Sequence, residues 1–206
     1  MKVLVIGATG ATGQLAVKQL LARGDDVTAL ARDPAAIAEK HARLTVMKGQ
    51  ASDAASLEQA LAGQEAVLVA FGPRSLGKTD VQETLMRNLL ASMKKTGVTR
   101  LINLSGWGAG DSLAHASFFM KVIQATVLKN IYQDKNRGEA LLTGSDVNYT
   151  NVRPGRLLNS SARGGVRANL DGKGLKPEMT REDLAAFMIA QLTSDAWTKK
   201  SPIIGY

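Results

Sequence analysis

The sequence predicts an α/β fold in which helices cover both faces of one doubly wound parallel sheet. Two observations predict it. Short apolar runs alternate along the chain with longer amphipathic segments, the pattern of successive βα units. A glycine-rich turn, residues 7–13, joins the first apolar run directly to the first amphipathic segment. The 206 residues are 45% hydrophobic and 21% charged, as in ordinary globular proteins, so we expect a single domain over residues 1–206.

The predicted strands are runs rich in Val, Ile, Leu and Ala, typical of strands that are buried on both faces. They are Lys2–Ile6, Val27–Ala31, Leu44–Lys48, Ala66–Ala70, Arg100–Leu104 and Val147–Val152. The stretch Pro154–Pro177 is rich in Gly, Arg and Asn, so we expect loops there, with one short strand near Val166–Leu170. Pro202–Gly205 is expected to form a last strand at the edge of the sheet.

The predicted helices carry apolar residues at helical spacing between these strands. They are Thr12–Arg23, a segment opened by Ser52 and Asp53 that runs to about Leu61, Asp80–Thr96, Ala114–Leu142 and Arg181–Leu192. Capping residues support two of the ends, because Gly24 follows the first helix and Thr180 with Asp183 resembles a capping box. Asp33 is expected to cap a short helix whose first residue is Pro34.

Composition narrows the functions that the chain can have. The formal net charge is +8, but Lys and Arg are spread along the chain and only 4% of residues are aromatic. This favours a basic surface that attracts an anionic cofactor or substrate over nucleic-acid binding. The lack of cysteine and the two histidines argue against disulfides and metal sites. No apolar run is long enough to span a bilayer or to form a secretion signal, so we expect a cytoplasmic protein without a membrane partner.

The turn Gly7-Ala8-Thr9-Gly10-Ala11-Thr12-Gly13 has the composition of a phosphate-binding loop. Gly7 allows a tight turn, Gly10 lets a diphosphate approach the backbone, and Gly13 lets the helix pack closely on the strand. The helix that follows offers unpaired N–H groups and the positive end of its dipole. The position of the turn between a strand and a helix predicts a dinucleotide site. Its residues are Gly7, Thr9, Gly10, Ala11, Thr12 and Gly13.

The spacing Gly-x-x-Gly-x-x-Gly resembles that of the atypical or extended short-chain dehydrogenases/reductases, which implies a Rossmann-like fold. Within that superfamily the chain is similar to the NmrA-like NAD(P)H-binding group, and most of all to flavin reductases of the biliverdin reductase B type. The other segments that carry the resemblance are Ala31-Arg32-Asp33, Phe71-Gly72-Pro73-Arg74, Leu104-Ser105 and Val152-Arg153-Pro154-Gly155. The resemblance covers nearly the whole chain. We expect a cofactor half over about residues 1–105 and substrate-side elements over about residues 106–206.

Arg32, at the end of the second strand, decides which cofactor we expect. Sites that prefer NAD usually carry Asp or Glu there, which accepts hydrogen bonds from the ribose 2′-hydroxyl. A guanidinium instead pairs bidentately with a 2′-phosphate, which a carboxylate would repel. Asp33 lies next to Arg32, but its place before Pro34 favours a capping role. NADP(H) is therefore expected over NAD(H).

Further cofactor contacts are expected at the carboxyl ends of the other strands. These positions are Gln50, Ala51, Phe71, Gly72, Arg74 and Pro154. Many relatives place an aspartate where this chain has Gln50, whose amide can still hydrogen-bond an adenine edge. Arg74 is expected to reach a phosphate or an anionic substrate, or else to lie on the surface. The backbone around Pro154 is expected to border the nicotinamide.

The acid–base residues of standard short-chain dehydrogenases are incomplete in this chain. Those enzymes use a serine at the end of strand five and a Tyr-x-x-x-Lys pair on the next helix. Ser105 matches the serine, and we expect it to act as a catalytic hydrogen-bond donor near the nicotinamide or substrate, or else to cap a turn. Tyr132 is followed four residues later by Asn136, whereas Lys135 is three residues away. Tyr132 and Lys135 share roughly one helix face, so a degenerate pair stays an alternative.

Substrate contacts are expected from Gly106, Trp107 and Arg156, which follow the fifth and sixth strands. The Trp107 ring can stack on a flat acceptor or simply pack. An apolar surface within residues 118–122 could form a lid, an oligomer contact or part of the core, and we take core as the default. We expect a monomer or a homodimer, and no metal.

Two functions fit these features. The first is an NADPH-dependent oxidoreductase that transfers a hydride to a conjugated acceptor such as a flavin, a quinone or a linear tetrapyrrole. Such acceptors delocalise the added charge and take a proton from solvent, so the protein needs little beyond a cofactor and a pocket. The second is a non-catalytic NADP(H)-binding redox sensor of the NmrA-like type. A sugar-nucleotide epimerase or dehydratase is disfavoured, because the Tyr/Lys pair and a larger C-terminal substrate region are missing.

Overall fold

The alternation of side chains along the central strands explains why both faces of the sheet are covered. The computed structural model describes residues 1–72 and 77–206. In β1 (Lys2–Ile6), Val3 and Val5 belong to one apolar cluster, whereas Leu4 and Ile6 belong to another. Because successive side chains of a strand point to opposite faces, the two clusters lie on opposite sides of the sheet.

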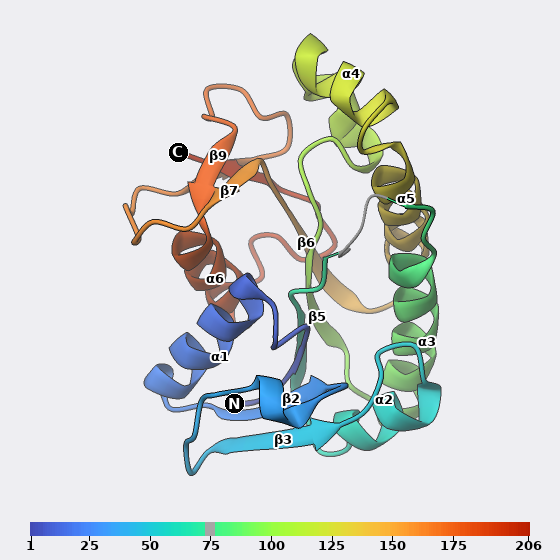
Figure 1. Cartoon of the computed structure of the whole chain (residues 1–206), viewed down its shortest axis with the longest axis vertical. Helices are drawn as coiled ribbons and strands as arrows, with labels where there is room; N and C mark the ends of the chain where they lie inside the picture. Colours follow the sequence, from blue (N-terminus) through green and yellow to red (C-terminus); the bar gives the residue numbers. More distant parts are fainter. Residues whose placement is uncertain (73–76) are drawn as a thin grey trace.

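Helices cover both clusters. Helices α1 (Ala11–Arg23) and α6 (Arg181–Ala190) pack against each other and supply the first cluster. Helices α2 (Ala54–Leu61), α3 (Val81–Thr96) and α5 (Lys129–Thr143) supply the second. Figure 1 shows α1 and α6 on one side of the sheet and α2, α3 and α5 on the other. This is the doubly wound α/β arrangement that the sequence predicts.

Eight strands form the main sheet in the order β3-β2-β1-β4-β5-β6-β10-β8. The strands other than β1 are β2 (Asp26–Ala31), β3 (Leu44–Lys48), β4 (Ala66–Val69), β5 (Arg100–Leu104), β6 (Asn148–Pro154), β8 (Arg167–Asn169) and β10 (Ile203–Gly205). All pairs are parallel except β10 with β8. The strand order reverses between β1 and β4, and open α/β sheets bind their ligands in the crevice at that point.

The C-terminal strand corrects one expectation. Residues 202–205 were expected at the edge of the sheet, but β10 lies inside it, parallel to β6 and antiparallel to β8. The short strand expected near Val166–Leu170 is present as β8 and forms the edge instead. Two further strands, β7 (Arg156–Leu158) and β9 (Glu178–Thr180), pair in a separate sheet that the sequence did not predict. Strands of three residues are too short to show a periodic pattern.

The long helix expected over Ala114–Leu142 is broken into three pieces. A 3₁₀ helix, η2 (Gly110–His115), is followed by α4 (Phe118–Ala125) and then by α5. Ser117 caps α4, because its hydroxyl accepts a hydrogen bond from the Met120 amide at 3.2 Å. Helix α4 ends at Thr126, whose backbone leaves the helical region and whose hydroxyl donates to the Val122 carbonyl oxygen at 2.8 Å. Apolar spacing continues across this break, so the pattern alone did not reveal it.

The predicted helix starts at Asp33 and Thr180 are confirmed. The Asp33 side chain accepts a hydrogen bond from the Ala35 amide at 3.1 Å and caps the short 3₁₀ helix η1 (Pro34–Ala36). The Thr180 hydroxyl accepts from the Asp183 amide at 3.1 Å, which caps α6. No helix within residues 1–72 and 77–206 combines the length and the apolar character that crossing a membrane requires.

Candidate cofactor-binding site

The turn between β1 and α1 is built so closely that glycine is required at two positions. Gly7 has a φ of +86°, and its carbonyl oxygen accepts a hydrogen bond from the Gly10 amide at 2.9 Å. A Cβ atom added to Gly13 would lie 2.0 Å from that same oxygen. Both glycines therefore let the first turn of α1 pack against the end of β1, as the spacing of the motif predicts.

The N-terminus of α1 is open among the residues that the structure describes. Gly10 occupies the cap position and offers no side chain, and no acidic residue lies in the first turn. Within the described chain, no acceptor is found for the amides of Ala11, Thr12 and Gly13. These N–H groups and the helix dipole together favour an anion at this end of α1.

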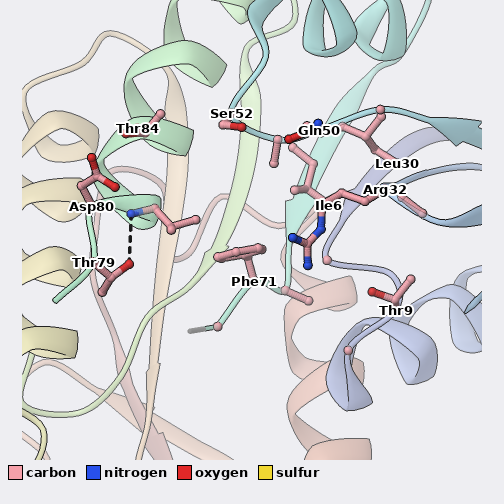
Figure 2. Close-up of a pocket in the computed structure, with 18 residues that line it drawn as sticks. Ile6, Thr9, Leu30, Arg32, Gln50, Ser52, Phe71, Thr79, Asp80 and Thr84 are labelled. Carbon is pink, nitrogen blue, oxygen red and sulfur yellow. Dashed lines mark hydrogen bonds between the residues drawn. The ribbon is translucent and has the colours of Figure 1, made fainter. Parts of the chain in front are cut away.

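A cavity of about 520 Å³ opens beside this helix end. It lies at the carboxyl ends of β1, β2, β3 and β4 and reaches the start of α3. Figure 2 shows the residues around it. Eight of the predicted cofactor residues line it: Gly7, Thr9, Gly10, Arg32, Gln50, Ala51, Phe71 and Gly72. The cavity thus joins the glycine loop to the segments after β2, β3 and β4, which are far apart in the sequence.

Arg32 supplies the positive charge of the cavity. Its side chain is exposed, and Figure 2 shows it extending into the space between Phe71 and Thr9. Within the described chain its guanidinium has no hydrogen-bond or ion-pair partner. Asp33 caps η1 through its own side chain, so this carboxylate is engaged on the helix amide. A guanidinium that is not paired internally is available to an anionic ligand.

The sequence did not point to the wall formed by the start of α3. Thr79, Asp80, Val81 and Thr84 line the same cavity as the glycine loop. Their place directly after the loop that follows β4, at the carboxyl edge of the sheet, was the signal that could have found them. Unlike α1, this helix end is closed. The Asp134 carboxylate of α5 accepts hydrogen bonds from the Gln82 amide at 3.0 Å and the Glu83 amide at 3.1 Å.

Ser105, the predicted catalytic serine, lies outside this cavity. It is 7% exposed, and its hydroxyl donates a hydrogen bond to the Glu139 carboxylate. The other oxygen of Glu139 lies 2.6 Å from the Arg153 guanidinium in a buried ion pair. Arg153 also reaches the exposed Asp111 carboxylate at 2.5 Å. The Ser105 hydroxyl is therefore one end of a polar network inside the protein, and its catalytic role stays a prediction.

Trp107 connects several elements beyond β5. Its amide donates to the carbonyl oxygen of Pro154 at 2.7 Å, and its own carbonyl oxygen accepts from the Tyr132 hydroxyl at 3.1 Å. A Cβ atom on Gly172 would lie 2.4 Å from the indole ring, so a loop backbone packs on the ring. Gly106 faces the Tyr132 hydroxyl, which would lie 3.3 Å from an added Cβ atom.

Three further predicted residues lie outside the cavity or outside the described residues. Arg156 is exposed and pairs with Glu178 at 2.8 Å, on the small β7–β9 sheet. Arg74 lies outside the described residues. Pro154 ends β6, and it does not line the cavity of the glycine loop. The substrate roles of Gly106, Trp107 and Arg156 stay predictions.

Tyr132 and Lys135 both lie on α5, but their side chains form no hydrogen bond with each other. The Tyr132 hydroxyl is used by the Trp107 carbonyl oxygen, and burial raises the pKa of this phenol above its usual value. Burial also lowers the pKa of the Lys135 ammonium, against the opposing effect of Glu139 and Asp134. A phenol with a raised pKa is a weaker acid near neutral pH. Among the described residues, no group of His, Asp and Glu side chains could hold a metal ion.

Comparison with known proteins agrees with this geometry. An uncharacterized chloroplastic protein of Arabidopsis thaliana is 30% identical over 181 residues, which are 80% of this chain and 62% of that protein. This chain therefore spans less than two thirds of that relative's length. Among solved structures, the anaerobilin reductase ChuY of Escherichia coli O157:H7 superposes with a TM-score of 0.82 at 22% identity, over 100% of this chain and 97% of that one.

A second solved structure carries a dinucleotide. It is a wide-type short-chain dehydrogenase/reductase of Veillonella parvula in complex with NADP, with a TM-score of 0.81 at 21% identity over 100% of this chain and 94% of that one. Both structural likenesses establish the Rossmann-like fold. A family model described as NAD(P)H-binding matches residues 7–195, from the glycine loop to a point shortly after α6. The chain therefore belongs to the NAD(P)H-binding family.

Proposed function

We propose that this protein is an NADPH-dependent reductase that passes a hydride to a conjugated acceptor such as a flavin, a quinone or a linear tetrapyrrole. One observation carries the proposal: Gly10, which caps the open amide end of α1, lines the same cavity as the Arg32 guanidinium, which has no partner within the described chain. When bound, NADPH would supply the hydride. The work of this chain is to hold the cofactor and to place the acceptor against it.

The charges around the cavity support NADP(H) over NAD(H). Among its 18 described lining residues, Arg32 is the only cation and Asp80 the only acid. Asp80 belongs to the start of α3, and Figure 2 shows it across the cavity from Arg32. The Arg32 guanidinium would pair with a 2′-phosphate, while the Gln50 amide would reach the adenine edge. The diphosphate would then lie on the amides of Ala11, Thr12 and Gly13.

The hydroxyl groups near β5 support an acceptor that needs little acid catalysis. Ser105 donates to Glu139, and Tyr132 donates to the Trp107 carbonyl oxygen, so both hydroxyls are engaged inside the protein. Reduction of a simple ketone needs a proton at the developing alkoxide. A flavin or quinone spreads the negative charge over its conjugated system and takes its proton from water.

Turnover with a panel of acceptors tests the reductase directly. NADPH absorbance is followed with flavins, quinones and simple ketones, each with and without the protein. We expect steady NADPH consumption with at least one conjugated acceptor and none with the ketones. Tight NADPH binding without consumption of any acceptor would support the redox sensor instead. Absence of calorimetric heat with either dinucleotide would refute both.

Arg32→Ala tests the preference for NADP(H). We expect NADPH binding to weaken by about 1–3 kcal/mol, the range of a charge-assisted contact, with NADH binding nearly unchanged. Calorimetric titration of both cofactors measures the difference. Arg87→Ala is the matched control, because this exposed arginine on α3 pairs with Glu83 and does not line the cavity. Equal losses for both cofactors in Arg32→Ala would show that the 2′-phosphate is recognised elsewhere.

A further inference from the structure

Helix α4 presents an apolar surface that no other described part of the chain covers. Phe118 is 83% exposed and Phe119 is 72% exposed, which overturns the default expectation of a core position for this run. Of the seven exposed large apolar side chains in the described residues, five fall within residues 113–127. They are Leu113, Phe118, Phe119, Val122 and Val127, and we call them the α4 patch. Scattered single apolar residues on a surface are ordinary, whereas several within one short segment indicate an interaction site.

The packing of α4 explains why this surface is open. Gln124 is its only buried residue, and its amide donates to the Trp107 carbonyl oxygen at 3.3 Å. Gln124 also packs against Gly108, where an added Cβ atom would collide with the glutamine amide. Figure 1 shows α4 projecting at the end of the molecule beyond α5, away from α1 and α2. Gln124 is thus the only side chain of α4 that is fully buried, while its two phenylalanines are exposed.

The charged residues within the chain segment that carries the α4 patch are all lysines. No Asp or Glu occurs from residue 112 to residue 133, whereas Lys121 and Lys129 in this stretch are both exposed. The whole chain carries a net charge of +8. Exposed aromatic residues next to lysines, without acids, are the pattern of a helix that lies in the interface of an anionic membrane.

We propose that α4 docks this protein on the surface of an anionic lipid bilayer, which departs from the expectation that it has no membrane partner. Phe118 and Phe119 would enter the boundary between headgroups and acyl chains, while Lys121 and Lys129 would contact anionic headgroups. The charges disfavour a second copy of the chain as the occupant, because two identical basic patches would repel each other. An interfacial helix of this kind lies on the membrane and does not cross it.

Sedimentation with lipid vesicles tests the proposal. The protein is mixed with vesicles of phosphatidylcholine alone or of phosphatidylcholine with phosphatidylserine. We expect binding to the anionic vesicles only, weakening as salt is raised. The double variant Phe118→Ser/Phe119→Ser should bind at least about tenfold more weakly. Lys121→Gln should weaken binding about fivefold, from roughly 1 kcal/mol per lysine.

Leu170→Ser is the matched control, because Leu170 is 54% exposed but lies next to β8, outside the α4 patch. It should bind vesicles as the unchanged protein does. Thermal melts and NADPH titrations of all variants check that folding and cofactor binding are intact. The proposal is refuted if anionic vesicles do not bind, or if the Phe variant binds equally well. It is also refuted if sedimentation equilibrium shows that the Phe residues hold two copies together.

Discussion

Two helices begin at the same cavity, but one N-terminus is open and the other is closed. At α1 the cap residue is Gly10, and the first amides find no acceptor in the described chain. At α3 the Asp134 side chain, which is 1% exposed, accepts from the amides of Gln82 and Glu83. The Thr79 hydroxyl donates to the same carboxylate at 3.3 Å.

The difference shows that position at the sheet edge does not by itself make an anion site. Both helices follow parallel strands and direct their dipoles toward the cavity, but α3 already holds an anion of its own. A ligand phosphate would have to displace the Asp134 carboxylate there, whereas at α1 it meets free amides. The diphosphate is therefore expected at α1, and the start of α3 forms a cavity wall that carries the Asp80 carboxylate.

We expect the largest effect on cofactor binding when the N-terminus of α1 is changed to resemble that of α3. Gly10→Asp places a carboxylate at the cap of α1, where it accepts from the amides that would bind a diphosphate and repels that diphosphate. We expect NADPH binding to weaken by about 100-fold, with folding retained. Calorimetric titration measures the affinity, and a thermal melt checks the fold.

Gly10→Asn is the control for the size of the new side chain. It has the same shape as Asp without the charge, so we expect it to weaken NADPH binding clearly less than Gly10→Asp does. Equal affinities for the two variants would mean that charge at the α1 terminus does not govern cofactor binding.

The second test removes the carboxylate that closes the N-terminus of α3. Asp134→Ala leaves the amides of Gln82 and Glu83 without their acceptor, and we expect the free energy of unfolding to fall by about 2 kcal/mol. Chemical denaturation measures it. Asp134→Asn keeps one acceptor oxygen, so its free energy of unfolding should fall by less than that of Asp134→Ala. An unchanged free energy of unfolding in the alanine variant would show that water accepts these hydrogen bonds as well as the carboxylate does.

The third test concerns the cap at the start of α2, where we expect the smallest effect and a dependence on pH. Asp53 caps this helix, accepting from the Ser56 hydroxyl at 2.6 Å and the Ser56 amide at 2.9 Å. The hydrogen bond from the Ser56 hydroxyl holds the pKa of Asp53 below its usual value. Its contribution to stability is therefore present above the usual carboxyl range and is lost as pH falls through the lowered pKa.

Asp53→Ala should accordingly lower the melting temperature slightly at about pH 7, with the difference from the unchanged protein shrinking toward about pH 3. Asp53→Asn keeps a neutral cap, so its difference at about pH 7 should be smaller, but it should change with pH by the same amount, because both variants remove the titrating carboxyl group. A gap between Asp53→Ala and the unchanged protein that grows on acidification would contradict the assigned sign.

Local patterns predicted the secondary structure around the glycine turn well. Apolar runs such as Lys2–Ile6 and the glycine turn that follows depend on neighbouring residues, so the strand, the turn and the start of α1 could all be predicted. Arg32 was assigned to the site for the same reason, since it ends the strand next to β1. The capping role of Asp33 followed from Pro34 alone.

Contacts between segments that are far apart in the chain could not be predicted from the sequence. Asp134 and the Gln82 amide lie 52 residues apart, and nothing in either segment indicates the other. The exposure of Phe118 is a second case, because apolar spacing predicts a helix face but not whether another element covers it. The break at Thr126 was missed because the apolar pattern continues through it.

The inner position of β10 has a consequence for the order in which the protein folds. Within the described strands, β8 pairs with β10 alone, so residues 167–169 cannot join the sheet before residues 203–205 have docked on β6. During synthesis on the ribosome, β1 to β6 can associate while this last segment is still being made. The pairing of β8 with the sheet is thus a late event. In nascent chains halted just before residue 203, a protease should still cleave within residues 167–169.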